Sequence, residues 1–238
     1  MASEMEALLL QAGVPVEPDR IAALNVYLRM LADWNTRMDL TSVPDAEMAR
    51  RHFLDSLLPL TRAEYFPQGI RLIDVGTGAG FPGLALAVAR PDFQVTLLEA
   101  QGKRCQFLRA VCDELGLTNV TVIQERAEVS GHAEGLREAY DRAVARAVAP
   151  LNVLCEYLLP FVKPGGYALC WKGPAVSDEM EDGAAAARKL GGSVEAPVTL
   201  AWEGENHLLI PVRKTETTLP QYPRKNGIPA KRPLKKDK

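Results

Sequence analysis

Residues 74–83 read Asp-Val-Gly-Thr-Gly-Ala-Gly-Phe-Pro-Gly, a glycine-rich turn between a short apolar strand at 71–75 and a helix. Glycine lets the backbone turn tightly and approach a ligand closely, because no Cβ intrudes. Amide groups at the start of the following helix can face a carboxylate or a phosphate. Residues 78–83 also satisfy the pattern G-x-G-x-x-G, so the stretch predicts a site for a nucleotide-like cofactor.

Helical and strand-like segments alternate along the chain on either side of this turn. A capping-box pattern at Ser3 and Glu6 predicts a first helix, and no strand is expected before residue 70. We expect helices at 3–12, 18–35, 44–58, 84–89, 102–115, 151–159 and 175–190, strands at 71–75, 93–98, 120–123, 143–145 and 167–171, a turn at 163–166, and a hairpin of 194–201 with 207–213.

This alternation predicts an α/β fold with a mostly parallel sheet covered on both faces. The sequence suggests three parts rather than independent domains. We expect a helical N-terminal extension packed on the sheet over 1–66, the sheet domain over 67–214, and a basic C-terminal tail over 215–238.

Composition excludes several classes of protein. The 238 residues are 47% hydrophobic and 24% charged, which is ordinary for a soluble globular chain. The four cysteines form no C-x-x-C pair and the three histidines lie far apart, so we expect neither a metal site nor a disulfide-stapled fold. Without a signal peptide or a long apolar run we expect no membrane association and a cytoplasmic location.

Charge is distributed unevenly. Residues 221–238 carry seven Lys or Arg and one Asp, whereas the other 220 residues carry 21 bases and 29 acids. A basic end on an acidic body suggests a polyanionic partner such as RNA. The prolines and apolar residues of the tail indicate that part of it packs against the body, with only the last residues loose.

Two acids favour S-adenosylmethionine over a dinucleotide as the cofactor. Glu99 ends the second expected strand, where a carboxylate can accept hydrogen bonds from ribose hydroxyls. Asp74 directly precedes the glycine turn, where it would attract a sulfonium or amino group and repel a pyrophosphate. The chain also has no room for the catalytic domain of a dehydrogenase.

The sequence resembles the bacterial 16S ribosomal RNA guanine-N7 methyltransferases, also called the glucose-inhibited division protein B family. Asp39 stands where many members have Asn, and Ala-Arg-Ala at 145–147 stands where the family has Ser-Arg-Ala. The motifs that carry the resemblance are the glycine turn, Gly-Lys-Arg at 102–104, Trp-Asn-Thr-Arg-Met-Asp-Leu-Thr at 34–41, Arg-His-Phe-Leu-Asp-Ser-Leu at 51–57, and the tail pattern R-K-x-G-x-P-x-K-x-P-L at 224–234.

The resemblance implies a class I S-adenosylmethionine-dependent methyltransferase, with a Rossmann-like sheet of seven strands of which only the last inserted one is antiparallel. It implies transfer of a methyl group to N7 of a guanine in 16S rRNA of the small ribosomal subunit, guanine 527 of the 530 loop. With the acids already discussed, the residues expected at the cofactor are Asp74, Gly76, Gly78, Phe81, Glu99, Ala100, Gln101, Ala127, Glu128 and Arg146.

Guanine N7 carries a lone pair and no proton, so its methylation needs no general base and no covalent intermediate. We expect Arg146 to act by positioning, either paired with a carboxylate or in contact with guanine O6 or a phosphate. We expect RNA contacts, mostly to phosphates, from Arg51, His52, Lys172, Arg224, Lys225, Lys231 and Arg232. The enzyme is expected to be a monomer.

Three other readings remain open from the residues alone. A methyltransferase of another RNA, a protein or a small molecule would share every cofactor feature and differ in what enters the cleft. A NAD-linked oxidoreductase would differ in the cofactor that shifts its melting temperature, and an RNA-binding scaffold would lack turnover. We expect deletion of 221–238 to impair RNA methylation but not cofactor binding, which would distinguish an RNA methyltransferase from one that acts on a small molecule or a protein.

Overall fold

The computed structural model describes residues 3–146, 148–202 and 205–236. The chain forms two compact units, one of residues 1–70 with 77–124 and the other of residues 71–76 with 125–238. The sequence-based division at 66/67 and 214/215 stays a prediction. No helix among the described residues is long and apolar enough to cross a membrane.

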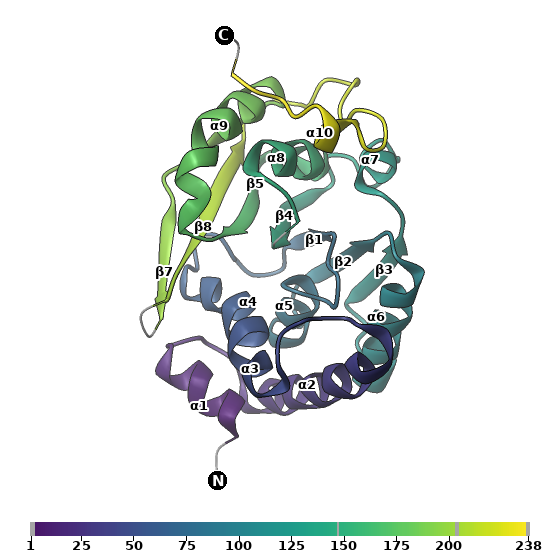
Figure 1. The fold of residues 1–238 in the computed structure, drawn as a ribbon, viewed down its shortest axis with the longest axis vertical. Helices are drawn as coiled ribbons and strands as arrows, with labels where there is room; N and C mark the ends of the chain where they lie inside the picture. Colours follow the sequence, from purple (N-terminus) through teal and green to yellow (C-terminus); the bar gives the residue numbers. More distant parts are fainter. Residues whose placement is uncertain (1–2, 147, 203–204, 237–238) are drawn as a thin grey trace. The chain divides into compact units, whose positions relative to one another are not determined.

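The first unit begins with helices and ends with two parallel strands (Figure 1). Val95 lies opposite Val120 and Glu99 opposite Gln124, so β2 and β3 end together. The elements of this unit are α1 (Glu4–Gln11), α2 (Pro18–Met38), α3 (Asp45–Met48), the π-helical η1 (Ala49–Leu54), α4 (Asp55–Leu57), the 3-10 helix η2 (Leu58–Thr61), α5 (Gly83–Ala89), β2 (Gln94–Glu99), α6 (Gly102–Glu114) and β3 (Val120–Gln124).

The helices of this unit follow the sequence predictions closely. Ser3 caps α1, because its hydroxyl accepts a hydrogen bond from the Glu6 amide at 3.2 Å. The second helix continues beyond the expected residue 35 and stops at Asp39, whose φ of 51° is left-handed. Asp and Asn tolerate this conformation better than other non-glycine residues, which explains why either can stand at this position.

The second unit contains the remaining strands and the C-terminal segment. Its strands are hydrogen-bonded in the order β1-β4-β5-β8-β6, and β7 pairs with β8. The elements are β1 (Arg71–Val75), α7 (Ala127–Ser130), β4 (Tyr140–Arg146), α8 (Leu151–Leu158), the 3-10 helix η3 (Leu159–Phe161), β5 (Val162–Lys172), the 3-10 helix η4 (Pro174–Glu179), α9 (Met180–Lys189), β6 (Gly192–Val194), β7 (Val198–Trp202), β8 (Glu205–Lys214) and α10 (Ile228–Lys231).

Only β8 runs against the others. It is antiparallel to β5, β6 and β7, while β1, β4 and β5 are parallel. Val194 pairs with Val212 and Val198 with Leu209, so β6 and β7 occupy successive stretches along one side of β8. Pro197 lies between them and has no amide to donate, which accounts for the break. The predicted mostly parallel sheet is confirmed, and the strand expected at 194–201 is divided into β6 and β7 along β8.

One predicted turn is wrong. Residues 163–166 lie inside β5 rather than before it, because Val162 pairs with Tyr140 and Tyr167 pairs with Arg142 on the neighbouring strand. The register shift between these two pairs marks a bulge. A Lys-Pro-Gly-Gly sequence favours a turn locally, but the chain on both sides of it stays bonded to β4.

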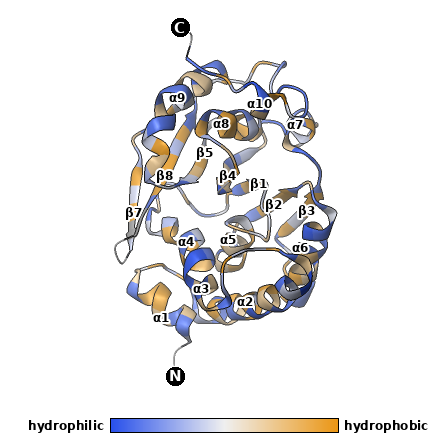
Figure 2. Ribbon diagram, viewed as in Figure 1, coloured by the Kyte–Doolittle hydropathy of each residue, from blue (hydrophilic) through white to orange (hydrophobic). Residues whose placement is uncertain are grey.

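The core of the second unit is built on β4, β5 and α8. Hydrophobic residues run along α8, and seven of its eight residues are buried (Figure 2). Two of the buried residues are polar, Asn152 and Glu156, and the Glu156 carboxylate is fully buried. Such a carboxylate needs a partner to be tolerated, and its partner is described below.

Candidate active site

The glycine turn is tied to the end of β2 within the first unit. The Thr77 amide donates to the Leu98 carbonyl at 3.3 Å. The amides of Gly80 and Phe81 both donate to the Thr77 carbonyl, at 2.9 and 3.0 Å, and so close a tight turn ahead of α5. These bonds place the turn beside the last residue of β2.

That last residue is Glu99, and the structure brings it together with the turn as the sequence predicted. Its side chain is nearly buried, and its two oxygens accept hydrogen bonds from the amides of Gly78 at 3.0 Å and Gln101 at 2.8 Å. Arg104 lies 3.9 Å from the same carboxylate. A carboxylate can accept about four hydrogen bonds, so Glu99 keeps acceptor capacity for ligand hydroxyls.

Phe81 anchors the turn in an aromatic cluster from the N-terminal helices. Its ring stacks on Tyr27 and on His52, with centroid distances of 5.4 and 4.7 Å. Phe53 meets it edge-on at 5.1 Å. The side chain of Phe81 is therefore a buried support of the turn, and the contact of residue 81 with the cofactor stays a prediction.

The two N-terminal signatures meet at His52. The Nε2 atom of His52 lies 2.7 Å from the Thr41 hydroxyl. Asn35 and Thr41 exchange two hydrogen bonds, from the Asn35 side-chain amide to the Thr41 carbonyl and from the Thr41 amide back to Asn35 Oδ1. His52 thus links the 34–41 segment to Phe81, and its contact with RNA stays a prediction.

In the second unit, the predicted residues lie at the carboxyl ends of parallel strands. Asp74 is fully buried near the end of β1 and pairs in register with Val144 of β4. Two residues further along β4 is Arg146, half-buried at the strand's last position. Ligands of open α/β sheets bind at this edge, so both side chains are suitably placed for a cofactor or substrate.

The pair Ala127 and Glu128 opens α7, a helix of one turn. The Glu128 carboxylate is buried and accepts a hydrogen bond from the Gly227 amide at 2.9 Å. Gly227 belongs to the C-terminal segment, which the sequence assigned to RNA. The C-terminal segment, which is predicted to bind RNA, therefore contacts Glu128, which is predicted to bind the cofactor.

The cationic residues predicted at the RNA fall into two groups. Arg51 is exposed and pairs with Glu47 on its own helix at 3.0 Å, and Lys225, Lys231 and Arg232 are exposed. Lys172 and Arg224 are engaged inside the protein. Lys172 bonds to the Ala149 carbonyl at 3.0 Å and to Glu179 at 2.6 Å, and its contact with RNA stays a prediction.

Arg224 forms an ion pair with a buried acid of α8. Its Nε and Nη2 atoms donate to the buried Glu156 carboxylate at 2.8 and 2.6 Å, and its backbone amide donates there at 2.8 Å. The same carboxylate raises the pKa of Arg224, chiefly through the side-chain hydrogen bond. Sequence reasoning missed Glu156, because a glutamate among apolar helical residues carries no signal of a partner 68 positions away.

Burial raises the pKa of all four cysteine thiols. For Cys112 the value is about 11 and for Cys170 about 12, and Cys155 is fully buried. Only a small fraction of any of these thiols is ionised near neutral pH, and the thiolate is the nucleophilic form. Cys170 is a buried residue of β5. No cluster of three or more metal-ligating side chains occurs in the described part of the chain.

The described residues fit S-adenosylmethionine better than a dinucleotide. Glu99 keeps capacity for ribose hydroxyls, and Gly78 leaves its surroundings open, since a Cβ there would come no closer than 3.9 Å to any neighbour. The buried carboxylate of Asp74 would attract the positively charged sulfonium of S-adenosylmethionine and repel the pyrophosphate of a dinucleotide. Of the residues predicted at the cofactor, the first unit contains Gly78, Phe81, Glu99, Ala100 and Gln101, and the second unit contains Asp74, Gly76, Ala127, Glu128 and Arg146.

Solved structures share this fold at low sequence identity. A crystal structure of MtNAS in complex with MTA and tNA has a TM-score of 0.54 and 17% identity, covering 83% of this chain and 74% of that one. A 16S rRNA (adenine(1408)-N(1))-methyltransferase from Catenulisporales acidiphilia has a TM-score of 0.51 and 16% identity, covering 67% and 90%. The mostly parallel sheet, the glycine turn and the acid at the end of β2 define a class I S-adenosylmethionine-dependent methyltransferase.

The particular family follows from the sequence comparisons. The family model of rRNA small subunit methyltransferase G matches residues 20–209. Ribosomal RNA small subunit methyltransferase G of Alkaliphilus metalliredigens is 43% identical over 94% of this chain and 95% of its own length, and that of Moorella thermoacetica is 41% identical over 93% of both. The chain therefore belongs to the rRNA small subunit methyltransferase G family, and the resemblance found in its motifs is confirmed.

Proposed function

We propose that this enzyme transfers the methyl group of S-adenosylmethionine to N7 of a guanine in 16S rRNA within the small ribosomal subunit. The expected target is guanine 527 of the 530 loop. The observation that carries the cofactor assignment is the Glu99 carboxylate, held against the glycine turn by the Gly78 amide. Family membership supports the rRNA substrate.

The chemistry at N7 suits the residues present. Bound S-adenosylmethionine supplies an electrophilic methyl group, and N7 attacks it with an in-plane lone pair. No proton has to be removed before attack, and the cysteine thiols, whose pKa values are raised, are poor nucleophiles. The protein's task is to orient the two reactants, which can account for much of the rate.

Arg146 is the residue we assign to this orientation. It ends β4, next to the strand that carries Asp74. A guanidinium there can hold guanine O6 or a phosphate while leaving N7 accessible. A cation close to a sulfonium is unfavourable unless it is directed elsewhere. We therefore propose that the Arg146 guanidinium contacts the RNA and not the sulfonium.

We propose that exposed cations bind the phosphates of an RNA presented by the assembled subunit. Lys225, Lys231 and Arg232 are exposed, and Arg51 is exposed in its pair with Glu47, whereas Arg224 and Lys172 are held by internal acids. Phosphate contacts position the enzyme and release counterions, so binding should weaken steeply with salt. The enzyme would act as a monomer, in the cytoplasm where its substrate resides.

The test is to incubate the chain with labelled methyl donor and small subunits, then to map the modified nucleotide by reverse transcription after cleavage at N7-methylguanine. A single stop at guanine 527 is the expected result. Activity on a short naked hairpin should be weaker than on subunits. Label in another RNA or in a small molecule would show that the chain is a methyltransferase with a different substrate. If no label is transferred at all, the proposed function is wrong.

A further inference from the structure

The C-terminal segment contacts α7 and the two residues that follow it, Gly131 and His132. The Gly227 amide donates to Glu128 at 2.9 Å, and His132 Nε2 lies 2.7 Å from the Pro223 carbonyl. Gly131 ends α7, and a Cβ on it would lie 2.8 Å from the Pro223 ring. Residues 223–227 thus pack against both ends of this one-turn helix.

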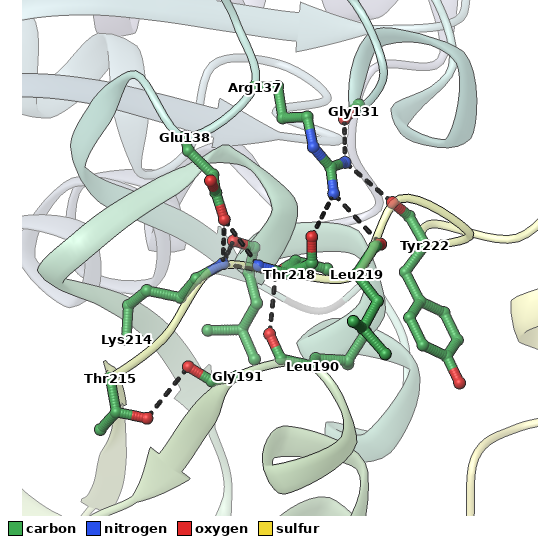
Figure 3. A network of polar contacts seen from close by, with 11 residues as sticks. Gly131, Arg137, Glu138, Leu190, Gly191, Lys214, Thr215, Thr218, Leu219 and Tyr222 are labelled. Atoms are coloured by element: carbon green, nitrogen blue, oxygen red, sulfur yellow. Dashed lines mark hydrogen bonds and ion pairs between the residues drawn. The ribbon is translucent and has the colours of Figure 1, made fainter.

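Arg137 joins the same two parts of the chain (Figure 3). Its Nη1 atom donates to the carbonyls of Gly131 and Tyr222, both at 2.8 Å. Its Nη2 atom donates to the carbonyls of Thr218 at 2.7 Å and Leu219 at 3.2 Å. One guanidinium therefore fixes the chain after α7 to the start of the C-terminal segment.

The segment begins at a buried polar cluster in the same view (Figure 3). Lys214 is fully buried and bonds to the Leu159 carbonyl at 2.7 Å and to Glu138 at 3.1 Å. The Thr218 amide donates to the Glu138 carboxylate at 2.7 Å, and its hydroxyl donates to the Leu190 carbonyl at 2.7 Å. These bonds fix where the chain leaves β8.

Arg224 and Glu156 hold the segment at its middle. The Glu156 carboxylate has no exposed surface, and three donors of Arg224 reach it. Breaking such a pair leaves a charge buried without a partner, which costs several kcal/mol. The pair therefore sets the position of residues 223–227, and with them the hydrogen bond from Gly227 to Glu128.

We propose that Arg224 is a positioning residue for the cofactor: through Pro223 and Gly227 it holds the Ala127–Glu128 turn in the conformation that binds S-adenosylmethionine. This inference rests on the proposed function, which places Ala127 and Glu128 at the donor. It reverses the sequence-based expectation that loss of 221–238 leaves cofactor binding intact. The segment would then support the Ala127–Glu128 part of the cofactor site in the second unit, while Lys225 and Lys231 are exposed toward solvent.

The test compares three variants of the full chain by calorimetry with S-adenosylhomocysteine. Glu156→Leu/Arg224→Met removes both charges and leaves none buried alone, so the fold should survive. Its Kd should be about tenfold weaker than that of the parent chain. Arg224→Lys keeps one charged donor and should recover part of this loss. The control Lys236→Ala breaks the pair of Lys236 with Glu181 on α9 and should change Kd by less than about twofold.

Melting temperature and steady-state kinetics separate positioning from general loss of structure. The double variant should stay folded at the assay temperature and show a raised KM for the donor, with a smaller change in kcat on small subunits. A donor Kd equal to that of the parent, with subunit methylation lost, would overturn the inference and restore a purely RNA-binding role. If the parent chain itself gives no heat with S-adenosylhomocysteine, the proposed function fails instead.

Discussion

The hydroxyl of Tyr27 donates a hydrogen bond to the backbone carbonyl of Ala79, 52 residues further along the chain. Both residues are buried, and the Tyr27 ring also stacks on Phe81. Tyr27 lies on α2, so the helical N-terminal segment supports the glycine turn directly. The N-terminal motifs of this family and its cofactor loop therefore form one packed structure in the first unit.

Gly80→Ala should destabilise the protein through this contact. Gly80 has a φ of +100°, and a Cβ there would lie 2.2 Å from the Tyr27 hydroxyl and 2.8 Å from the Leu84 Cβ. Neither neighbour can move without disturbing the aromatic cluster. We expect the free energy of unfolding, measured with urea, to fall by about 3 kcal/mol or more.

Gly135→Ala is the matched control for this substitution. Gly135 has a φ of +80°, but a Cβ there would meet nothing within 4 Å. It should therefore show only the backbone strain, about 1 kcal/mol. Equal losses at residues 80 and 135 would mean that Tyr27 does not constrain the turn.

Local patterns were sufficient to predict the elements around the site. The turn at 74–83, the acid at the end of β2 and the capped first helix depend on neighbours in sequence, and the structure shows all three. The hairpin before residue 214 was also predicted, with its first strand shorter than expected, at Val198–Trp202. Such features follow from residue spacing and side-chain periodicity alone.

Long-range pairs could not be predicted in the same way. The residues near Arg224 in sequence do not indicate whether its side chain pairs with a buried acid on α8 or binds an RNA phosphate. The ion pair of Lys172 with Glu179 could not be predicted either, although these two residues are closer in the sequence. The turn predicted at 163–166 failed because pairing of β5 with β4 on both sides overrides the local preference of Lys-Pro-Gly-Gly.

Cys170→Ala should leave methyl transfer unchanged. Burial raises the pKa of this thiol to about 12, so it carries almost no thiolate at neutral pH. The variant should keep kcat within about twofold and lose about 1 kcal/mol of stability, because a small cavity replaces the sulfur. A large fall in kcat without unfolding would point to covalent catalysis and contradict direct attack by N7.

The stability of the protein should depend on pH through Lys214. Burial lowers its pKa from 10.5 to about 8, against the opposing effect of Glu138. Between pH 8 and 10.5 the unfolded chain therefore binds more protons at this residue than the folded one. Its contribution to the free energy of unfolding rises over this interval, by on the order of 3 kcal/mol.

Lys214→Met isolates that contribution from the other titrating groups. The pKa values of the cysteines are raised in the folded state, so their contribution to the free energy of unfolding falls as pH rises. This fall is the same in the parent and in the variant. The difference in free energy of unfolding, parent minus variant, should thus increase from pH 8 to pH 10 in urea titrations. A difference that is flat over this range would mean that Lys214 titrates normally.

Arg146→Ala should lower kcat/KM for small subunits by about a hundredfold, because a misplaced base loses its alignment with the methyl group. Arg146→Lys keeps the charge but loses the planar fork that suits O6 or phosphate, so it should recover only part of the activity. Arg188→Ala, at an exposed position near the end of α9, is the control for loss of a positive charge. If Arg146→Ala stays folded and methylates subunits at the parent rate, the orienting role belongs to another residue at the carboxyl edge of the sheet.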